Sequence, residues 1–267
     1  MSGLPPDRGL DEHGFVRREG SRERVQPAFE EVVEGYVAAV RSGFGADLDS
    51  AYLYGSIPRG TARPGVSDLD GQVALTREPT GADRARLDAV ERRLEAAYPQ
   101  VSAVEILLDS RARLVDPRLR HDEGFHVRVL CTPFWGPDAG VDVQPHRPDL
   151  DLARGVQGDW RGALHLLRER AGGLAPEDVA GRRALCRSTG RRLTRIAFSW
   201  VMPRWEGWTS DPGAMARVVT RYEPGWALPV ADAAYLGWSG ADDLGLARRL
   251  LDGWAQDLTA RGEQLGA

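Results

Sequence analysis

The segment that decides the fold is residues 54–70, which read Tyr-Gly-Ser-Ile-Pro-Arg-Gly-Thr-Ala-Arg-Pro-Gly-Val-Ser-Asp-Leu-Asp. A glycine–serine pair, Gly55 and Ser56, ends an apolar stretch, and two aspartates follow eleven residues later. Glycine has no Cβ, so backbone N–H groups and the serine hydroxyl can approach phosphate oxygens closely. Asp68 and Asp70 are two residues apart and share one face of a strand. Since Mg²⁺ binds one or two carboxylates together with substrate phosphates, the segment predicts a nucleoside triphosphate site that contains magnesium.

The composition predicts a globular protein in the cytoplasm. The chain has 267 residues, of which 42% are hydrophobic and 28% are charged, as in ordinary globular domains. No apolar run reaches the roughly 20 residues that span a bilayer, and the N-terminal residues lack the apolar stretch of a signal peptide. The two cysteines, Cys131 and Cys186, indicate neither a disulfide framework nor a zinc site.

The sequence contains no lysine, and its 35 basic residues are all arginines. Any cation that binds a phosphate group is therefore a planar guanidinium, and Arg59 and Arg63 are candidates because they lie between the glycine–serine pair and the aspartates. The net charge of −4 argues against a general nucleic-acid-binding protein, which normally carries a basic excess.

Hydrophobic periodicity predicts an α/β domain followed by an α-helical domain. A helix is expected from residue 27 to the glycines at 43 and 45, and another over 82–98. Strands are expected over 49–54, 69–76, 101–108 and 125–131, with loops over 57–67 and 132–140. Helical patterns then cover about 159–171, 177–202, 211–222, 227–237 and 243–261. The resulting domains are a flexible N-terminal arm over 1–24, an α/β domain over 25–145 and a helical domain over 146–267.

The third strand carries an acidic residue, Glu105, in an apolar run. Burying a carboxylate in a central strand is costly unless the carboxylate is used. If this strand lies beside that of Asp68 and Asp70, then Glu105 becomes a third metal ligand, a general base toward an attacking hydroxyl, or both. The alternative is an edge strand on which Glu105 points into water. Asp109, on the same face of the strand, is a reserve candidate.

The ordered combination of Gly55-Ser56, Asp68-Leu-Asp70 and a later acidic strand residue resembles the nucleotidyltransferase superfamily that includes DNA polymerase β. The string from Gly60 to Asp70 is similar to that of bacterial antibiotic adenylyltransferases. The two-domain layout and residues 187–200 resemble the helical domain of streptomycin and spectinomycin adenylyltransferases. The resemblance implies a nucleotidyltransferase-type mixed sheet with helices, followed by a C-terminal α-helical bundle.

The resemblance also implies Mg²⁺-dependent transfer of a nucleoside monophosphate, AMP from ATP in the first instance, to a hydroxyl of a small molecule such as an aminoglycoside-like antibiotic. Asp68, Asp70 and Glu105 would be the catalytic and metal-binding residues. The family's phosphate-binding lysine is missing, so an arginine of residues 187–200 is expected to replace it, and Arg192 is our candidate. The indole rings of two tryptophans in a predicted loop, at 205 and 208, either stack on a ligand or pack in the core.

Two other functions are compatible with the same motif. One is a nucleotidyltransferase that acts on a protein or an RNA end. The other is a catalytically silent antitoxin or regulatory binding protein of the same fold. Clustered carboxylates favour an enzyme, because a silent scaffold has no physical need for them.

Overall fold

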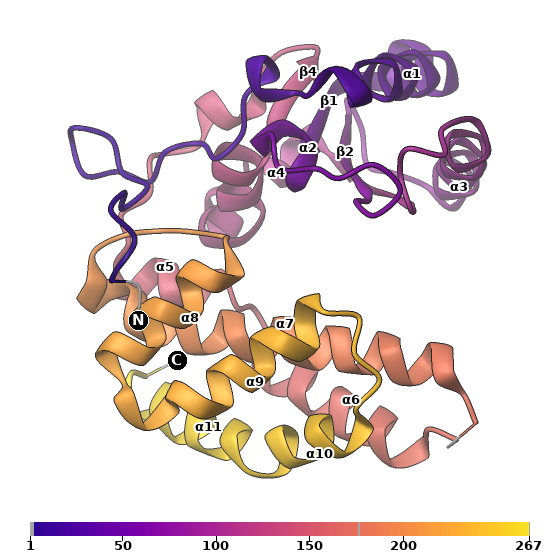
Figure 1. Cartoon of the computed structure of the whole chain (residues 1–267). Helices are drawn as coiled ribbons and strands as arrows, with labels where there is room; N and C mark the ends of the chain where they lie inside the picture. The colour runs from indigo at the N-terminus through magenta and orange to yellow at the C-terminus, as the bar shows by residue number, and fades with distance from the viewer. Residues whose placement is uncertain (1–2, 176, 267) are drawn as a thin grey trace. The chain divides into compact units, whose positions relative to one another are not determined.

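A computed structural model describes residues 3–175 and 177–266 of the chain. It divides into two compact units, which are described separately (Figure 1). The α/β unit comprises Arg17–His146, and the helical unit comprises Met1–Val16 together with Arg147–Ala267. The flexible arm was expected over 1–24, and its residues 3–24, which the structure describes, are divided between the two units.

Within the described residues, four strands form one mixed sheet in the order β3-β2-β1-β4. The strands are β1 (Leu48–Tyr54), β2 (Leu69–Leu75), β3 (Val104–Ser110) and β4 (Thr132–Trp135). β1 is antiparallel to β2 and β4, whereas β2 and β3 are parallel. The first three strands lie close to their expected positions, and the mixed sheet is confirmed.

Two helices, α1 (Pro27–Phe44) and α3 (Gly81–Ala97), pack on one face of this sheet. The apolar stripe that predicted α1 is buried, with Phe29, Val32 and Val40 fully excluded from solvent. α3 supplies the crossover that a parallel strand pair requires.

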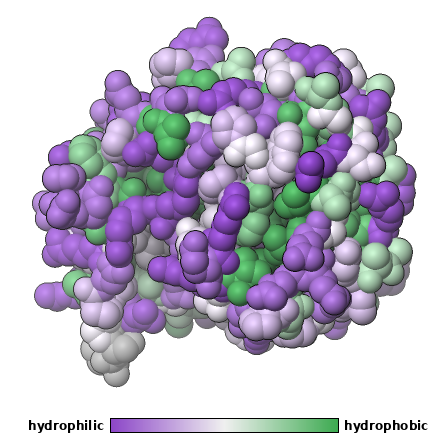
Figure 2. Space-filling model, turned by 90° about the horizontal axis from the view of Figure 1, so that it is seen from above, coloured by the Kyte–Doolittle hydropathy of each residue, from purple (hydrophilic) through white to green (hydrophobic). Residues whose placement is uncertain are grey.

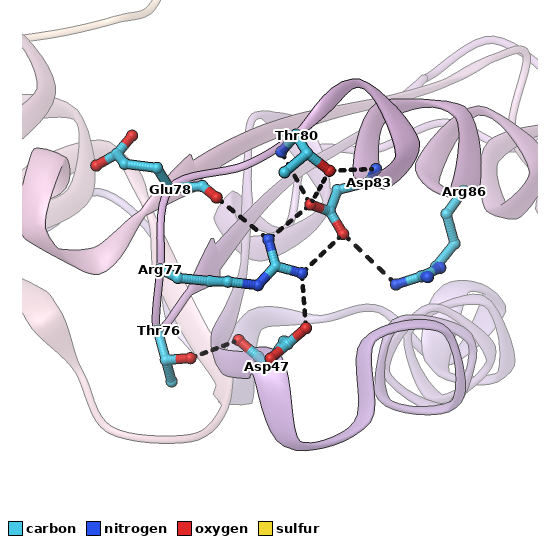
Figure 3. A network of polar contacts seen from close by, with 7 residues as sticks. All are labelled: Asp47, Thr76, Arg77, Glu78, Thr80, Asp83 and Arg86. Atoms are coloured by element: carbon cyan, nitrogen blue, oxygen red, sulfur yellow. Dashed lines mark hydrogen bonds and ion pairs between the residues drawn. The ribbon is translucent and has the colours of Figure 1, made fainter.

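A polar network fixes the start of α3 (Figure 3). The Thr80 hydroxyl accepts a hydrogen bond from the Asp83 backbone N–H, and the Asp83 carboxylate accepts one from the Thr80 N–H, which forms a capping box. Arg77 reaches the same carboxylate at 2.7 Å and bridges it to Asp47 at 2.6 Å. The bonds from Arg77 and then Thr80 hold the pKa of the buried Asp83 carboxyl well below its usual range. The network therefore fixes the turn between β2 and α3.

Short helical segments cover part of the opposite face of the sheet. They are α4 (Arg111–Leu114), η3 (Pro117–Leu119), η4 (Arg120–Gly124), η5 (His126–Leu130) and η6 (Ala139–Asp142). The strand expected over 125–131 is wrong, because η4 and η5 are π-helical, with Cys131 N–H donating to His126 C=O five residues earlier. The edge strand β4 occupies part of the expected loop over 132–140, and an edge tolerates its proline.

The helical unit is built around the long helix α7. Its elements are α5 (Leu150–Gly155), α6 (Trp160–Gly173), α7 (Val179–Trp205), α8 (Pro212–Tyr222), η7 (Pro224–Trp226), α9 (Ala227–Trp238), α10 (Leu244–Asp252) and α11 (Trp254–Gln264). α7 crosses α9 closely at Gly190, where an added Cβ would lie 2.3 Å from the Gly237 nitrogen. The helix expected over 243–261 is two helices, because the chain turns at Gly253 with φ −104° and ψ −86°.

No helix in the described part of the chain is long and apolar enough to cross a membrane. Hydrophilic residues cover most of the face seen in Figure 2, with smaller hydrophobic areas among them.

Candidate functional site

The glycine–serine pair forms a tight turn between β1 and the short helix α2 (Ser56–Arg59), which extends into the expected loop over 57–67. Gly55 has φ 78° and ψ −150°, a backbone conformation that is almost exclusive to glycine. The turn is closed by hydrogen bonds from Gly60 N–H to Ile57 C=O at 3.1 Å and from Thr61 N–H to Ser56 C=O at 3.0 Å. We call residues 55–61 the phosphate turn, after the role that the sequence predicts for Gly55 and Ser56.

The carboxylate of Asp70 lies directly against the phosphate turn. A Cβ on Gly55 would lie 2.1 Å from Asp70 Oδ2 and 3.1 Å from its Cγ. Glycine is therefore favoured at position 55 for a second reason, besides the positive φ of this residue. Only a backbone without a side chain allows the carboxylate to approach the turn this closely.

The strand register brings a second carboxylate to this site. Asp70 pairs with Tyr54 on β1 and with Glu105 on β3. Residues directly opposite one another in neighbouring strands project from the same face of a sheet. Tyr54, Asp70 and Glu105 thus form a row across three strands, with neighbouring strands about 4.8 Å apart.

The position of Glu105 in the sheet is compatible with both interpretations. β3 is an edge strand of the sheet, and Glu105 is exposed in the α/β unit, as the solvated alternative expects. Its pairing with Asp70 also puts it beside the aspartate strand, as the catalytic interpretation expects. The role of Glu105 stays a prediction.

Asp68 precedes β2 by one residue and is half-buried, as is Asp70. Among the described residues, no group of three or more His, Cys, Asp or Glu side chains is arranged to hold a metal ion. The donor set nevertheless suits Mg²⁺, which takes only one or two carboxylates from a protein and completes its shell with phosphate oxygens and water. The position of Asp70 against the phosphate turn would bring such ligands together.

The two arginines predicted to bind phosphate have different surroundings. Arg59 is part of α2, and its guanidinium forms an ion pair with Glu19 at 3.2 Å. Arg63 has an exposed side chain and begins a tight turn in which its N–H donates to the Ser67 hydroxyl at 3.0 Å. No pattern in the sequence indicated a role for Glu19, which is 40 residues from its partner.

Arg192 lies on α7 of the helical unit. Burial lowers the pKa of this half-buried guanidinium, with no contribution from a carboxylate among the described residues. A half-buried cation that lacks an opposing charge is costly, so an anionic ligand would stabilise this side chain.

Three further candidates have contacts within their own units. The indole rings of Trp205 and Trp208 are buried and pack edge-on against Phe198, at 6.0 and 5.8 Å between ring centroids, so core packing is correct for both. Asp109 forms an ion pair with Arg113 at 3.1 Å. Burial, followed by the charge of Glu123, raises the pKa of Asp109 to about 6.

A mixed sheet with helices, a glycine turn beside a strand aspartate and a separate helical unit define a nucleotidyltransferase-type fold. Comparison with solved structures supports this class. The structure matches that of the spectinomycin adenyltransferase AAD(9) from Enterococcus faecialis, solved with ATP and spectinomycin, with a TM-score of 0.53. The match covers 86% of this chain and 98% of that one at 14% sequence identity, so the two share a fold. The sequence matches no protein-family model and no curated protein.

Proposed function

We propose that this protein is a Mg²⁺-dependent nucleotidyltransferase that transfers AMP from ATP to a hydroxyl group of a small molecule. The observation that carries the proposal is the contact between Asp70 and the phosphate turn at Gly55, together with the register that pairs Asp70 with Glu105. The fold shared with an adenyltransferase supports the same class of reaction.

In the proposed reaction, the acceptor hydroxyl oxygen attacks the α-phosphorus of ATP. A new phosphorus–oxygen bond forms, the bond between the α-phosphorus and the bridging oxygen breaks, and pyrophosphate leaves. Asp68 and Asp70 would hold Mg²⁺, which neutralises charge on the phosphates when it is bound. Glu105 would accept the proton of the attacking hydroxyl, for which its exposed carboxylate is accessible.

The phosphate turn and arginines would hold the triphosphate. Backbone N–H groups and the hydroxyl of Ser56 would contact phosphate oxygens at the turn. Arg59 lies within the turn and Arg63 lies two residues after it, and Arg192 would supply the cation that a lysine supplies in similar enzymes. The planar guanidinium of Arg192 can donate hydrogen bonds to two phosphate oxygens at once.

We propose an aminoglycoside-like antibiotic as the acceptor, because the matched structure contains spectinomycin. Inactivation of such a compound would make the protein a determinant of antibiotic resistance. Adenylylation of a protein or an RNA end would use the same residues with another acceptor.

The test is incubation with ATP labelled at the α-phosphate, Mg²⁺ and a panel of hydroxyl acceptors that includes spectinomycin. Labelled product and pyrophosphate are expected with the intact protein. Asp70→Asn is expected to lower the rate more than 100-fold, and Glu105→Gln by about 10²- to 10⁴-fold. Glu31→Gln, an exposed substitution on α1, is the matched control and should retain full activity.

Binding and chemistry are separated by two further measurements. Arg192→Gln is expected to raise the KM for ATP about tenfold, and Arg192→Lys to recover only part of this loss, because lysine lacks the planar fork. Tight binding of a macromolecular partner without turnover of any acceptor would contradict the proposal and favour the regulatory alternative.

A further inference from the structure

Residues 17–24 form an extended segment of the α/β unit that ends in the short helix η1 (Arg22–Arg24). The polar composition of this segment predicted a loose arm. Its backbone instead forms two hydrogen bonds near the middle of the segment, from Glu19 N–H to Val129 C=O at 2.9 Å and from Ser21 N–H to Pro58 C=O at 2.9 Å. We call residues 17–24 the strap.

Arginine side chains anchor the strap to residues that lie outside the phosphate turn. Arg18 forms a two-pronged ion pair with Asp138 at 2.7 and 3.0 Å and donates a further bond to Arg128 C=O at 3.0 Å. Arg22 donates to Pro133 C=O on β4 at 2.6 Å and stacks over the Phe134 ring at 5.5 Å. Paired guanidinium contacts of this kind fix orientation as well as position.

The strap also contacts the phosphate turn without intervening side chains. A Cβ on Gly20 would lie 2.9 Å from Pro58 Cβ and 2.5 Å from Thr132 Oγ1. A Cβ on Gly60, which has φ 73°, would lie 2.8 Å from Arg24 C=O oxygen. Two glycines therefore allow the strap and the turn to pack backbone against backbone.

Glu19 completes this contact with an ion pair to Arg59 at 3.2 Å. Its side chain is only 13% exposed, and that of Arg59 is 32% exposed, so water screens the pair less than it would at an open surface. Arg24 donates to the Glu19 C=O at 3.0 Å and fixes the backbone from which the carboxylate projects. The Arg59 guanidinium is thus oriented by the strap.

We infer that the strap holds the phosphate turn in the conformation that receives the triphosphate, and that Glu19 is a positioning residue that acts on the nucleotide through Arg59. The inference rests on the proposed function for the identity of the ligand. Asp70 lies against one end of the turn, at Gly55, and the strap packs against the other end, from Pro58 to Gly60. A turn fixed at both ends loses less conformational entropy when phosphate binds.

The first measurement needs no nucleotide. Hydrogen exchange of the Gly60 and Thr61 amides, which close the turn, is compared in the unsubstituted protein and in Glu19→Gln and Gly20→Ala. Exchange about five- to tenfold faster is expected in both variants. Gly81→Ala is the matched control, because its Cβ meets nothing within 4 Å, and should leave exchange at these amides unchanged.

The second measurement is the affinity for ATP and Mg²⁺ by calorimetry, with KM and kcat for the transfer reaction. Glu19→Gln is expected to raise Kd and KM for ATP about five- to tenfold and to change kcat less than twofold. A structural role alone would lower the active fraction, and hence the apparent kcat, at unchanged KM. In an Arg59→Gln background, Glu19→Gln is expected to have no further effect on Kd.

The outcomes are distinct. Wild-type affinity and wild-type exchange in both variants would overturn the inference, as would tighter ATP binding in Glu19→Gln, since that result means that Glu19 competes with phosphate for Arg59. A Glu19→Gln effect that persists in full without Arg59 would overturn the route through that residue. If the intact protein does not bind ATP but exchange at the turn is faster in the variants, the strap holds the turn and the proposed function fails.

Discussion

Gly55→Ala is expected to be the most destabilising glycine substitution in the phosphate turn, and its cost has two separable parts. The backbone at φ 78° and ψ −150° costs a residue with a Cβ about 1–3 kcal/mol. The added methyl group would also lie 2.1 Å from Asp70 Oδ2, and overpacking of this kind costs about 1–3 kcal/mol. The total of about 2–6 kcal/mol is a large share of the stability of an ordinary domain.

Two other glycines of the α/β unit separate the contributions. Gly65 has φ 71° but its Cβ would meet nothing within 4 Å, so Gly65→Ala should cost only the backbone part. Gly81 has neither a positive φ nor a neighbour within 4 Å, so Gly81→Ala should be neutral or stabilise by up to about 1 kcal/mol. The order of destabilisation is expected to be Gly55→Ala, then Gly65→Ala, then Gly81→Ala.

The contact with Asp70 is tested directly by a double-mutant cycle. Asp70→Ala removes the oxygen at 2.1 Å and leaves only the Cβ at 3.4 Å, an ordinary contact. Gly55→Ala should therefore cost about 1–3 kcal/mol less in the Asp70→Ala background. The assay is urea unfolding followed by circular dichroism at pH 7. Equal costs in both backgrounds, or a Gly55→Ala variant as stable as Gly81→Ala, would refute the close approach of the carboxylate to the turn.

Three further predictions concern stability and self-association. Burial lowers the pKa of His126 and His146 to about 4, whereas a histidine in the unfolded chain has a pKa of about 6.5. As the pH is lowered below 6.5, the unfolded chain therefore binds protons that the folded chain does not, and the free energy of unfolding should decrease by about 2 kcal/mol per histidine at pH 5. Urea unfolding of His146→Gln should show a smaller loss between pH 7 and pH 5. Thr80→Ala removes the capping bond of α3 and should lower the free energy of unfolding by about 1 kcal/mol. Glu91→Ala with Glu95→Ala exposes two backbone N–H groups of the edge strand β3 and should promote self-association in sedimentation velocity, whereas a monodisperse double variant would contradict that role.

The elements around the phosphate turn could be predicted from the sequence because each has a local signal. The α1 stripe has a helical period, β1 and β2 are short apolar runs, and glycine marks the turn. A local signal also indicates that Gly55 and Asp70 lie close together, because both residues belong to one sequence motif. Local signals thus sufficed for the fold class and for choosing the first candidate carboxylates.

The errors arose where a local pattern has two structural solutions. Phe125, Val127 and Val129 alternate with polar residues as in a strand, and all three are buried, yet they lie in or beside the π-helical segments η4 and η5. Burial of alternate residues is therefore not unique to a strand, and a period of two did not distinguish the two structures here. Pro133 made the neighbouring segment look like a loop, although an edge strand accepts it.

Two contacts between residues distant in the sequence were not predicted. The sequence left open whether Trp208 stacks on a ligand or packs in the core, and it did not indicate that Trp208 N–H donates to Arg8 C=O at 2.8 Å. In the α/β unit, Glu19 pairs with Arg59. Neither contact leaves a trace in periodicity or spacing, because the partner segments have no regular pattern of their own.

The edge strand β3 shows how such contacts determine the candidate site. Side chains of α3 take the place of a further strand along its open edge. Glu95 accepts a hydrogen bond from Val104 N–H at 3.0 Å, Glu91 accepts one from Ile106 N–H at 2.8 Å, and Arg84 donates to Ile106 C=O at 3.2 Å. In the sequence these charged residues look like an ordinary solvated helix surface.

These bonds also fix where Glu105 points. A shift of one residue in the pairing of β3 with β2 would turn every β3 side chain to the other face of the sheet. The α3 carboxylates bind the amides at 104 and 106, on either side of Glu105, and so hold the register in which Glu105 is opposite Asp70. The hydrogen bonds from α3 that protect the edge of the sheet from association therefore also bring the two candidate catalytic carboxylates to the same face.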